Sequence, residues 1–271
     1  MADQTSIFST LLRPDRAWTP ATRVVGHPII YQAVVDSTQR LAHAAAQAGA
    51  AEGLVVLADE QHAGKGRLGR RWLAPFGSSL LLSLLLRPAI PVTQAARLTM
   101  CVGLGAAEAV ETLTGLTVQL KWPNDLYLAN KKFAGLLTET SLNGDRLAYA
   151  VLGLGLNVNV QFAASDELAA TATSLAMELG HDVDRVALLE RVLLHIEARY
   201  LAMQRGESPA AAWRARLWGV GEPVQVTLTN GTLRGRTVGI NPDGALLLQT
   251  ADGTVHTVWA GDVTARPTGA G

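Results

Sequence analysis

Apolar residues spaced three and four positions apart predict four helices in the first 218 residues. An alanine-rich segment follows the polar residues 36–39 and ends at Gly49, which predicts a capped helix of about three turns. Longer helices are predicted over residues 94–113 and 184–204, and a shorter one over 209–217. The last segment opens with a serine and a proline, a pair that favours the start of a helix.

Strands are predicted where apolar residues are continuous or alternate with polar ones. These segments are residues 54–58, 78–86, 117–122, 126–128, 133–139 and 147–158. The run 78–86 is almost continuously apolar, which is typical of a central strand covered on both faces. Helices and strands together indicate an α+β domain.

The pattern changes at Gly219. From there to Arg266, short strand-like segments alternate with the turn sequences Asn-Gly, Pro-Asp-Gly and Asp-Gly, and no helical segment lies between them. This pattern predicts a small β-barrel of about 50 residues. We therefore expect a domain over residues 1–218 and a β-barrel domain over residues 219–271.

Composition narrows the function classes. The 271 residues are 48% apolar and 17% charged, with 23 basic and 23 acidic residues, as in ordinary globular proteins. Zero net charge argues against a protein that coats nucleic acid or an anionic membrane. The single cysteine, Cys101, cannot form an intrachain disulfide, and the N-terminal segment lacks the pattern of a signal peptide. We expect a cytoplasmic protein that binds no membrane.

Positive charge is nevertheless concentrated in the segment QHAGKGRLGRRW, residues 61–72. It contains a G-x-G-x-x-G match, but another strand follows instead of a helix, and no acidic residue stands about 20 positions on, so a dinucleotide fold is excluded. Walker and protein-kinase motifs are absent from the sequence as well. A flexible loop whose glycines and cations surround an anion remains, with a solvated basic hairpin as the alternative.

A second cluster lies in two nearby motifs, KWPND at residues 121–125 and KKFAG at residues 131–135. Each carries lysine at or next to a strand end. The segments 126–128 and 133–139 predict a hairpin around Asn130 and Lys131, which brings the two motifs together. Both clusters could therefore converge on one phosphate-bearing ligand. The six histidines are scattered and there is no second cysteine, so we expect no protein metal site.

The motifs DSTQ, QHAGKGRLGRRW, KWPND with KKFAG, and GLGLNVN, followed by the C-terminal barrel, resemble the biotin protein ligase family in order and spacing. The resemblance extends over residues 34–266. It implies a mixed β-sheet flanked by helices, similar to class II aminoacyl-tRNA synthetases and to biotin and lipoate ligases, with an SH3-like C-terminal barrel.

The resemblance also implies a reaction. Biotin and ATP would form biotinyl-AMP, whose biotinyl group passes to a lysine of a biotin carboxyl carrier protein, with Mg²⁺ on the nucleotide phosphates. By position in the motifs, Arg67 and Lys132 would contact the biotin carboxylate and the α-phosphate. Lys121 and Asp125 would bind phosphate and organise the acceptor amine. Outside the resemblance, Asp125 is an ordinary turn residue.

Further residues are implied as ligand contacts. The biotin site would comprise Ser37, Thr38, Gln39, Gln61, Lys65, Gly66, Arg67, Lys132 and Gly135. The ATP and adenylate site would comprise Lys65, Arg67, Arg70, Trp72, Lys121, Asn124, Asn157 and Arg266. Two simpler interpretations stay open, namely that residues 36–39 only cap a helix and that Trp72 is a core residue.

The sequence departs from the family pattern in two places. Lys65 stands where the family commonly has arginine, which keeps the charge but loses bidentate geometry. Only 35 residues precede Asp36, too few for the DNA-binding domain of the bifunctional members, so we expect a ligase that binds no DNA, as a monomer or weak homodimer. The alternatives are a lipoate or octanoate ligase and, from another class, a nucleic-acid-binding module.

Overall fold

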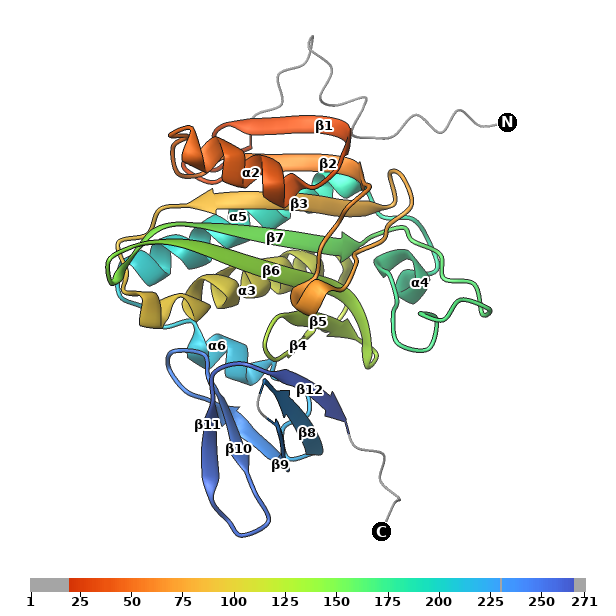
Figure 1. Cartoon of the computed structure of the whole chain (residues 1–271). Helices are drawn as coiled ribbons and strands as arrows, with labels where there is room; N and C mark the ends of the chain where they lie inside the picture. Colours follow the sequence, from red (N-terminus) through yellow and green to blue (C-terminus); the bar gives the residue numbers. More distant parts are fainter. Residues whose placement is uncertain (1–19, 230, 266–271) are drawn as a thin grey trace.

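A seven-stranded mixed sheet forms the larger part of the protein (Figure 1). The computed structural model describes residues 20–229 and 231–265. In spatial order, the strands are β1 (Ile29–Val35), β2 (Val55–Gln61), β3 (Ser79–Leu86), β7 (Arg146–Asn157), β6 (Lys131–Asn143), β5 (Asp125–Leu128) and β4 (Gln119–Lys121). Only β1 and β2 are parallel, and every other neighbouring pair is antiparallel.

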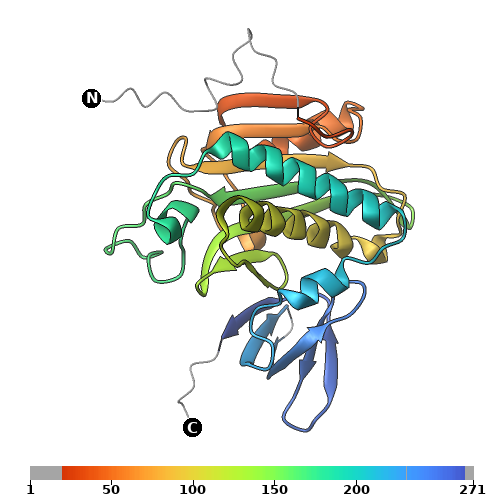
Figure 2. The same cartoon turned by 180° about the vertical axis from the view of Figure 1, so that it is seen from behind.

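Helices cover both faces of this sheet. The helix α2 (Thr38–Gln47) lies on the face seen in Figure 1, while α3 (Ala96–Thr114) and α5 (Arg185–Gln204) lie side by side on the other face (Figure 2). All eight residues of β3 are buried, which confirms the prediction of a central strand. Two short helices, α4 (Leu175–Leu179) and α6 (Ala210–Ala215), complete this part.

The C-terminal part is a five-stranded antiparallel sheet. Its spatial order is β11 (Val255–Val258), β10 (Leu246–Gln249), β9 (Gly231–Ile240), β8 (Pro223–Leu228) and β12 (Asp262–Ala265). The order runs from β11 to β12, so hydrogen bonds between the described strands do not close the sheet into a ring. An all-β C-terminal part is confirmed, and a barrel stays a prediction.

The two sheets share one hydrophobic core. A single cluster of buried residues includes Leu98 of α3 together with Val226 of β8 and Leu246 of β10. The indole Nε1 of Trp122 donates a hydrogen bond to the Gly244 carbonyl at 2.9 Å. The C-terminal sheet is therefore packed directly against the end of β4, the strand that carries Lys121.

The sequence missed two elements. Strand β1 has the sequence IIYQAVV, which is apolar except for Gln32 and is typical of a strand, although as an edge strand most of its residues are exposed or half-buried. Helix α4 has only five residues, too few for a helical period to be recognised. The predicted cap of α2 is wrong in its chemistry: Ser37 holds the N-cap position, but its side chain makes no capping hydrogen bond.

A buried ion pair fixes the strand ends next to the site. Arg185, at the start of α5, donates to the Asp59 carboxylate of β2 at 2.8 Å and to the Ser79 carbonyl of β3 at 3.1 Å. Both charged side chains are almost completely buried. Removing one partner of such a pair costs about 3–5 kcal/mol, so this contact holds β2 in place two residues before Gln61.

Candidate active site

A cavity of about 360 Å³ opens between the seven-stranded sheet, the glycine-rich loop and strand β12. Every predicted site residue within the described part of the chain lines it. These residues are Ser37, Thr38, Gln39, Gln61, Lys65, Gly66, Arg67, Arg70, Trp72, Lys121, Asn124, Asp125, Lys132, Gly135 and Asn157. The remaining one, Arg266, lies outside the described residues.

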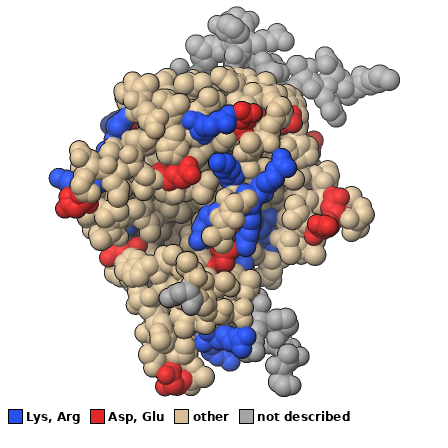
Figure 3. All heavy atoms as spheres, in the orientation of Figure 1, with Lys and Arg blue, Asp and Glu red and all other residues tan. Residues whose placement is uncertain are grey.

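The lining is strongly basic although the chain is neutral. Six lysine and arginine residues line the cavity against two carboxylates, Asp125 and Asp262. Figure 3 shows lysine and arginine side chains gathered at the centre of the face that is seen in Figure 1. The local charge expected from the sequence is thus collected around one cavity, which favours an anionic ligand over a solvated hairpin.

One end of the cavity is a chain of neutral polar groups. The backbone N–H of Thr38 donates to Gln61 Oε1 at 2.9 Å, and the Thr38 hydroxyl lies 2.8 Å from that of Ser83. Ser83 in turn donates to Gln39 Oε1 at 3.0 Å. The residues before and within α2 therefore take part in a pocket, and capping alone does not account for them.

Two glycines of β7 open the wall beside these groups. A Cβ built on Gly155 would lie 2.5 Å from the Trp72 ring, and one built on Gly153 would lie 2.8 Å from Gln39 Oε1. Any side chain at either position would displace a cavity residue. The Trp72 ring therefore lies directly against Gly155 at the cavity wall.

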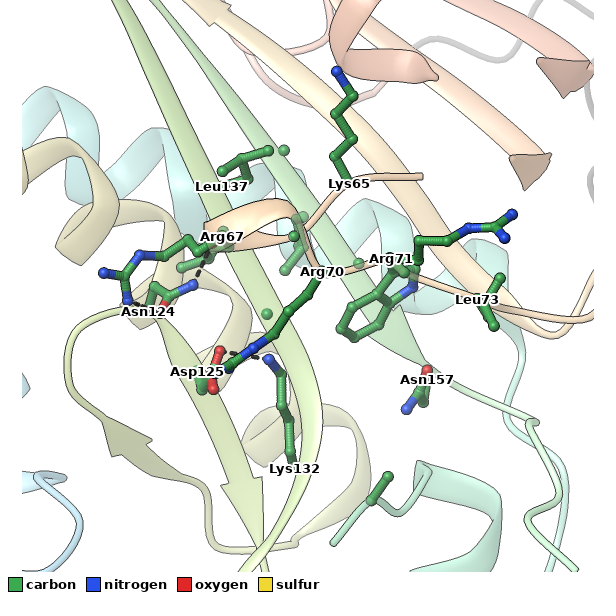
Figure 4. A pocket seen from close by; sticks show the side chains of 18 of the residues that line it. Lys65, Arg67, Arg70, Arg71, Leu73, Asn124, Asp125, Lys132, Leu137 and Asn157 are labelled. Atoms are coloured by element: carbon green, nitrogen blue, oxygen red, sulfur yellow. Dashed lines mark hydrogen bonds and ion pairs between the residues drawn. The ribbon is translucent and has the colours of Figure 1, made fainter. Parts of the chain in front are cut away.

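The loop cations extend in different directions. Figure 4 shows Lys65 and Arg71 pointing away from Arg67 and Arg70. Arg67 donates to Asn124 Oδ1 at 3.2 Å, to Asp262 Oδ1 at 3.1 Å and to the Gly261 carbonyl at 3.2 Å. Arg70 donates to the other oxygen of Asp262 at 2.8 Å. In this structure, therefore, the C-terminal sheet supplies the anion that holds the loop.

The hairpin of β5 and β6, which carries Lys131 and Lys132 and is called the lysine hairpin below, lies opposite the glycine-rich loop. Lys132 Nζ is 2.7 Å from Asp125 Oδ1, an ion pair without hydrogen-bond geometry, and 5.6 Å from the Trp72 ring centroid. Lys121 Nζ donates to Tyr127 Oη at 2.9 Å. Burial lowers the pKa of Lys121, while the carboxylates of Asp125 and Asp262 act in the opposite direction. These cations form the end of the cavity that suits phosphate.

Asn157 closes the cavity at the end of β7. Its Nδ2 donates to the Thr173 carbonyl at 3.1 Å, so its amide oxygen is left to accept from a ligand. The adjacent wall comes from Phe162, Leu168 and Ala172, in a segment that pairs with β6 through Lys132.

Sequence reasoning missed several lining residues. Ser83 interrupts the apolar run 78–86 and was given no role. A hydroxyl inside a buried strand is the signal that would have identified it. Asp262 gave no signal, because an aspartate after glycine between strands is a common turn residue. The wall at residues 162–172 has no motif of its own.

Asp262 provides a direct test of the loop contacts. We expect Asp262→Asn to increase trypsin cleavage after Arg67 and Arg70 severalfold in the ligand-free protein, because two ion pairs of about 0.2–1 kcal/mol each are weakened. Limited proteolysis followed by mass spectrometry measures the change. Asp252→Asn, in an exposed turn of the same sheet, is the matched control. Equal cleavage in the wild type, Asp262→Asn and Asp252→Asn would contradict the conclusion that Asp262 holds the loop.

Two further properties concern the described residues as a group. They contain no cluster of three or more His, Cys, Asp or Glu side chains that could hold a metal ion. They also contain no helix with the length and apolar character needed to cross a membrane.

Comparisons with known proteins identify the family. Residues 31–157 match the model of the biotin/lipoate A/B protein ligase family, and residues 219–266 match that of the biotin protein ligase C-terminal domain. A Bacillus spizizenii protein named bifunctional ligase/repressor BirA is 37% identical over 245 residues, covering 89% of this chain and 75% of the relative. The biotin–[acetyl-CoA-carboxylase] ligase of Mycobacterium tuberculosis is 35% identical over 219 residues, covering 78% of this chain and 79% of that protein.

Solved structures are similar as well. The biotin protein ligase from Aquifex aeolicus in complex with biotin and ATP superposes with a TM-score of 0.74 at 32% identity. The match covers 88% of this chain and 98% of that one.

Proposed function

Because the chain belongs to the biotin protein ligase family and is a biotin ligase enzyme, we propose that it forms biotinyl-AMP from biotin and ATP and transfers the biotinyl group to a lysine of a biotin carboxyl carrier protein. The observation that carries this proposal is the single cavity in which a neutral polar end adjoins a strongly basic one. A ligand with an uncharged ring at one end and a carboxylate next to a phosphate fits this arrangement.

The polar end suits the ureido ring of biotin. That ring presents both donors and an acceptor, and Ser37, Thr38, Gln39 and Gln61 offer hydroxyl and amide groups of both kinds. Gly66 and Gly135, which line the cavity, would leave room for the chain that links ring and carboxylate. Buried polar partners of this type discriminate strongly against ligands that lack matching groups.

The basic end of the cavity suits the formation of biotinyl-AMP and the transfer of its biotinyl group. A biotin carboxylate oxygen attacks the α-phosphorus of ATP, a new P–O bond forms, and the bond to pyrophosphate breaks. Arg67 and Lys132 would hold the two negatively charged reactants together and stabilise the charge that develops. The amine of the acceptor lysine then attacks the acyl carbon, AMP leaves, and the amine loses a proton. Lys121 and Asp125 would orient that amine and the phosphate.

The nucleotide would occupy the remaining wall. Trp72 would offer an aromatic face and Asn157 an amide oxygen to adenine, while Arg70 and Asn124 would contact the phosphates. Lys65 lines the same cavity but points away from Arg67 and Arg70 (Figure 4), so its side chain would have to turn to reach a phosphate. Arg266, which follows β12 in the sequence and lies outside the described residues, is proposed as a further phosphate contact from the family resemblance. Lysine at position 65 would bind as a point charge.

Mg²⁺ is proposed only as a companion of ATP. When bound, it neutralises nucleotide phosphates through few protein ligands. The described residues do not form a metal-holding cluster, so they do not fit a resident ion, and no step above depends on one.

Finer features of the architecture are proposals too. We place the domain boundary at residues 218 and 219, where α6 gives way to the C-terminal sheet. An SH3-like barrel and a relation of the mixed sheet to class II aminoacyl-tRNA synthetases are proposed from the family resemblance. We also propose a cytoplasmic location, where ATP and carboxylases are present.

Partners follow from the proposed reaction. The macromolecular substrate would be the carrier domain of a biotin-dependent carboxylase, with the enzyme a monomer or weak homodimer. Absence of DNA binding stays a prediction, because several bacterial relatives are named bifunctional ligase/repressor. A specific electrophoretic mobility shift with DNA would contradict it.

The decisive test is ATP–pyrophosphate exchange. We expect the purified protein to exchange labelled pyrophosphate into ATP when biotin is present, with at least tenfold less exchange when lipoate replaces biotin, because the polar end matches the ureido ring. Exchange with lipoate but not biotin would favour a lipoate ligase. No exchange with either, together with salt-dependent binding of oligonucleotides, would favour a nucleic-acid-binding module.

A further inference from the structure

The Lys121 ammonium lies over two neighbouring aromatic rings. Its Nζ is 4.9 Å from the ring centroid of Tyr127 and 5.1 Å from that of Trp218, and the two rings are 5.7 Å apart. Both distances are within the range of cation–π attraction, which is strongest for tryptophan. Tyr127 lines the cavity, as Lys121 does, whereas Trp218 does not.

Trp218 belongs to the segment that links the two sheets. Its backbone N–H donates to the Leu120 carbonyl at 3.0 Å, and the Leu120 N–H donates to the Arg216 carbonyl at 2.8 Å. The linker therefore forms an isolated parallel β-bridge with β4, between Leu217 and Leu120. This pairing fixes Trp218 next to Lys121, whose neighbour in the chain is Leu120.

The same indole also contacts the lysine hairpin. Trp218 Nε1 donates to Asn130 Oδ1 at 3.1 Å. Asn130 occupies the β5–β6 turn with a positive φ of 64°, and Lys132 follows two residues later. One side chain thus touches the element that carries Lys121 and the turn that precedes Lys132.

We infer that Trp218 is a positioning residue that holds Lys121 toward the nucleotide phosphates and aligns β4 with the lysine hairpin. A lysine side chain has four rotatable bonds and loses much conformational freedom when it is fixed. The two rings restrict it before the ligand arrives, so less freedom is lost on ATP binding. The linker to the C-terminal sheet thereby contributes to ATP affinity without touching ATP. This inference rests on the proposed function, in which Lys121 binds phosphate.

The test compares ATP and biotin in the full-length protein. We expect Trp218→Leu to raise the KM for ATP in biotin-dependent pyrophosphate exchange roughly tenfold, the effect of losing one desolvated cation–π contact and its preorganisation. The dissociation constant for biotin should change less than about twofold, because the polar end of the cavity is remote from Lys121. Trp218→Phe keeps an aromatic ring but loses the hydrogen bond to Asn130. It should recover most of the ATP affinity that Trp218→Leu loses. Val220→Ala, an exposed linker residue, is the matched control and should resemble the wild type.

A double-mutant cycle separates positioning from general packing. In a Lys121→Met protein, adding Trp218→Leu should raise the KM for ATP less than about twofold, because the cation that the indole holds is gone. Equal losses of ATP and biotin affinity, or a full additional loss in the Lys121→Met protein, would overturn the inference. If the wild type itself shows no biotin-dependent exchange, the proposed function fails instead, so the two failures are distinguishable.

Discussion

Lys132→Ala is expected to lower biotin-dependent pyrophosphate exchange by about 10²–10³-fold, the usual effect of removing one donor to developing charge. In the structure, the Lys132 ammonium lies at the cavity wall, between Asp125 and the Trp72 ring. It enters from the hairpin, opposite the side from which Arg67 enters. The α-phosphate would lose one of the two cations proposed to contact it.

The second half-reaction distinguishes this role from a folding defect. Synthetic biotinyl-AMP supplied to Lys132→Ala should still label the carrier lysine, because the activated bond is already formed. Lys131→Ala is the matched control, since Lys131 lies next to Lys132 but donates to the Ala169 carbonyl. Pyrophosphate exchange that survives in Lys132→Ala at the wild-type rate would show that Lys132 has been given the wrong role.

Arg67→Gly is expected to increase the dissociation rate of biotinyl-AMP by about 10- to 150-fold, which corresponds to the loss of a charge-assisted hydrogen bond of about 1.5–3 kcal/mol. Arg67 is three-quarters buried and lies where the loop covers the cavity. Without its side chain, the loop also loses its contacts to Asn124 and Asp262. The released adenylate should then acylate lysines of unrelated proteins in solution.

Two measurements check this expectation. Release of labelled biotinyl-AMP is followed by rapid filtration, and stray labelling is followed as biotin incorporated into serum albumin. Arg146→Ala, an exposed arginine remote from the cavity, should release adenylate at the wild-type rate. Unchanged release together with strict carrier specificity in Arg67→Gly would refute the role of Arg67.

The contacts of Arg67 in the ligand-free structure also bear on affinity. An anionic ligand must compete with Asp262 for Arg67 and Arg70, so part of its binding energy replaces contacts that already exist. The expected increase for Arg67→Gly is therefore toward the lower end of the range. This competition could not be predicted from the sequence, because 195 positions separate Arg67 from Asp262.

Local sequence determined the parts of the site that depend on residue type and short spacing. The DSTQ, GKGRLGRRW, KWPND and KKFAG motifs identified the family, and all of their predicted residues line the cavity. Helical periodicity identified α3 and α5, and an almost continuous apolar run identified β3, because the hydrophobic pattern of an element reflects the faces that it buries. Their assigned roles in binding and catalysis stay predictions.

Tertiary structure alone decided which groups meet across long separations. Ser83 joins the polar end because β3 passes beside α2, and Asp262 reaches the loop because the C-terminal sheet packs on Trp122. Trp218 approaches Lys121 because the linker pairs with β4. Residue type and spacing specify an element and its buried face, whereas these contacts depend on the packing of elements that no local pattern encodes.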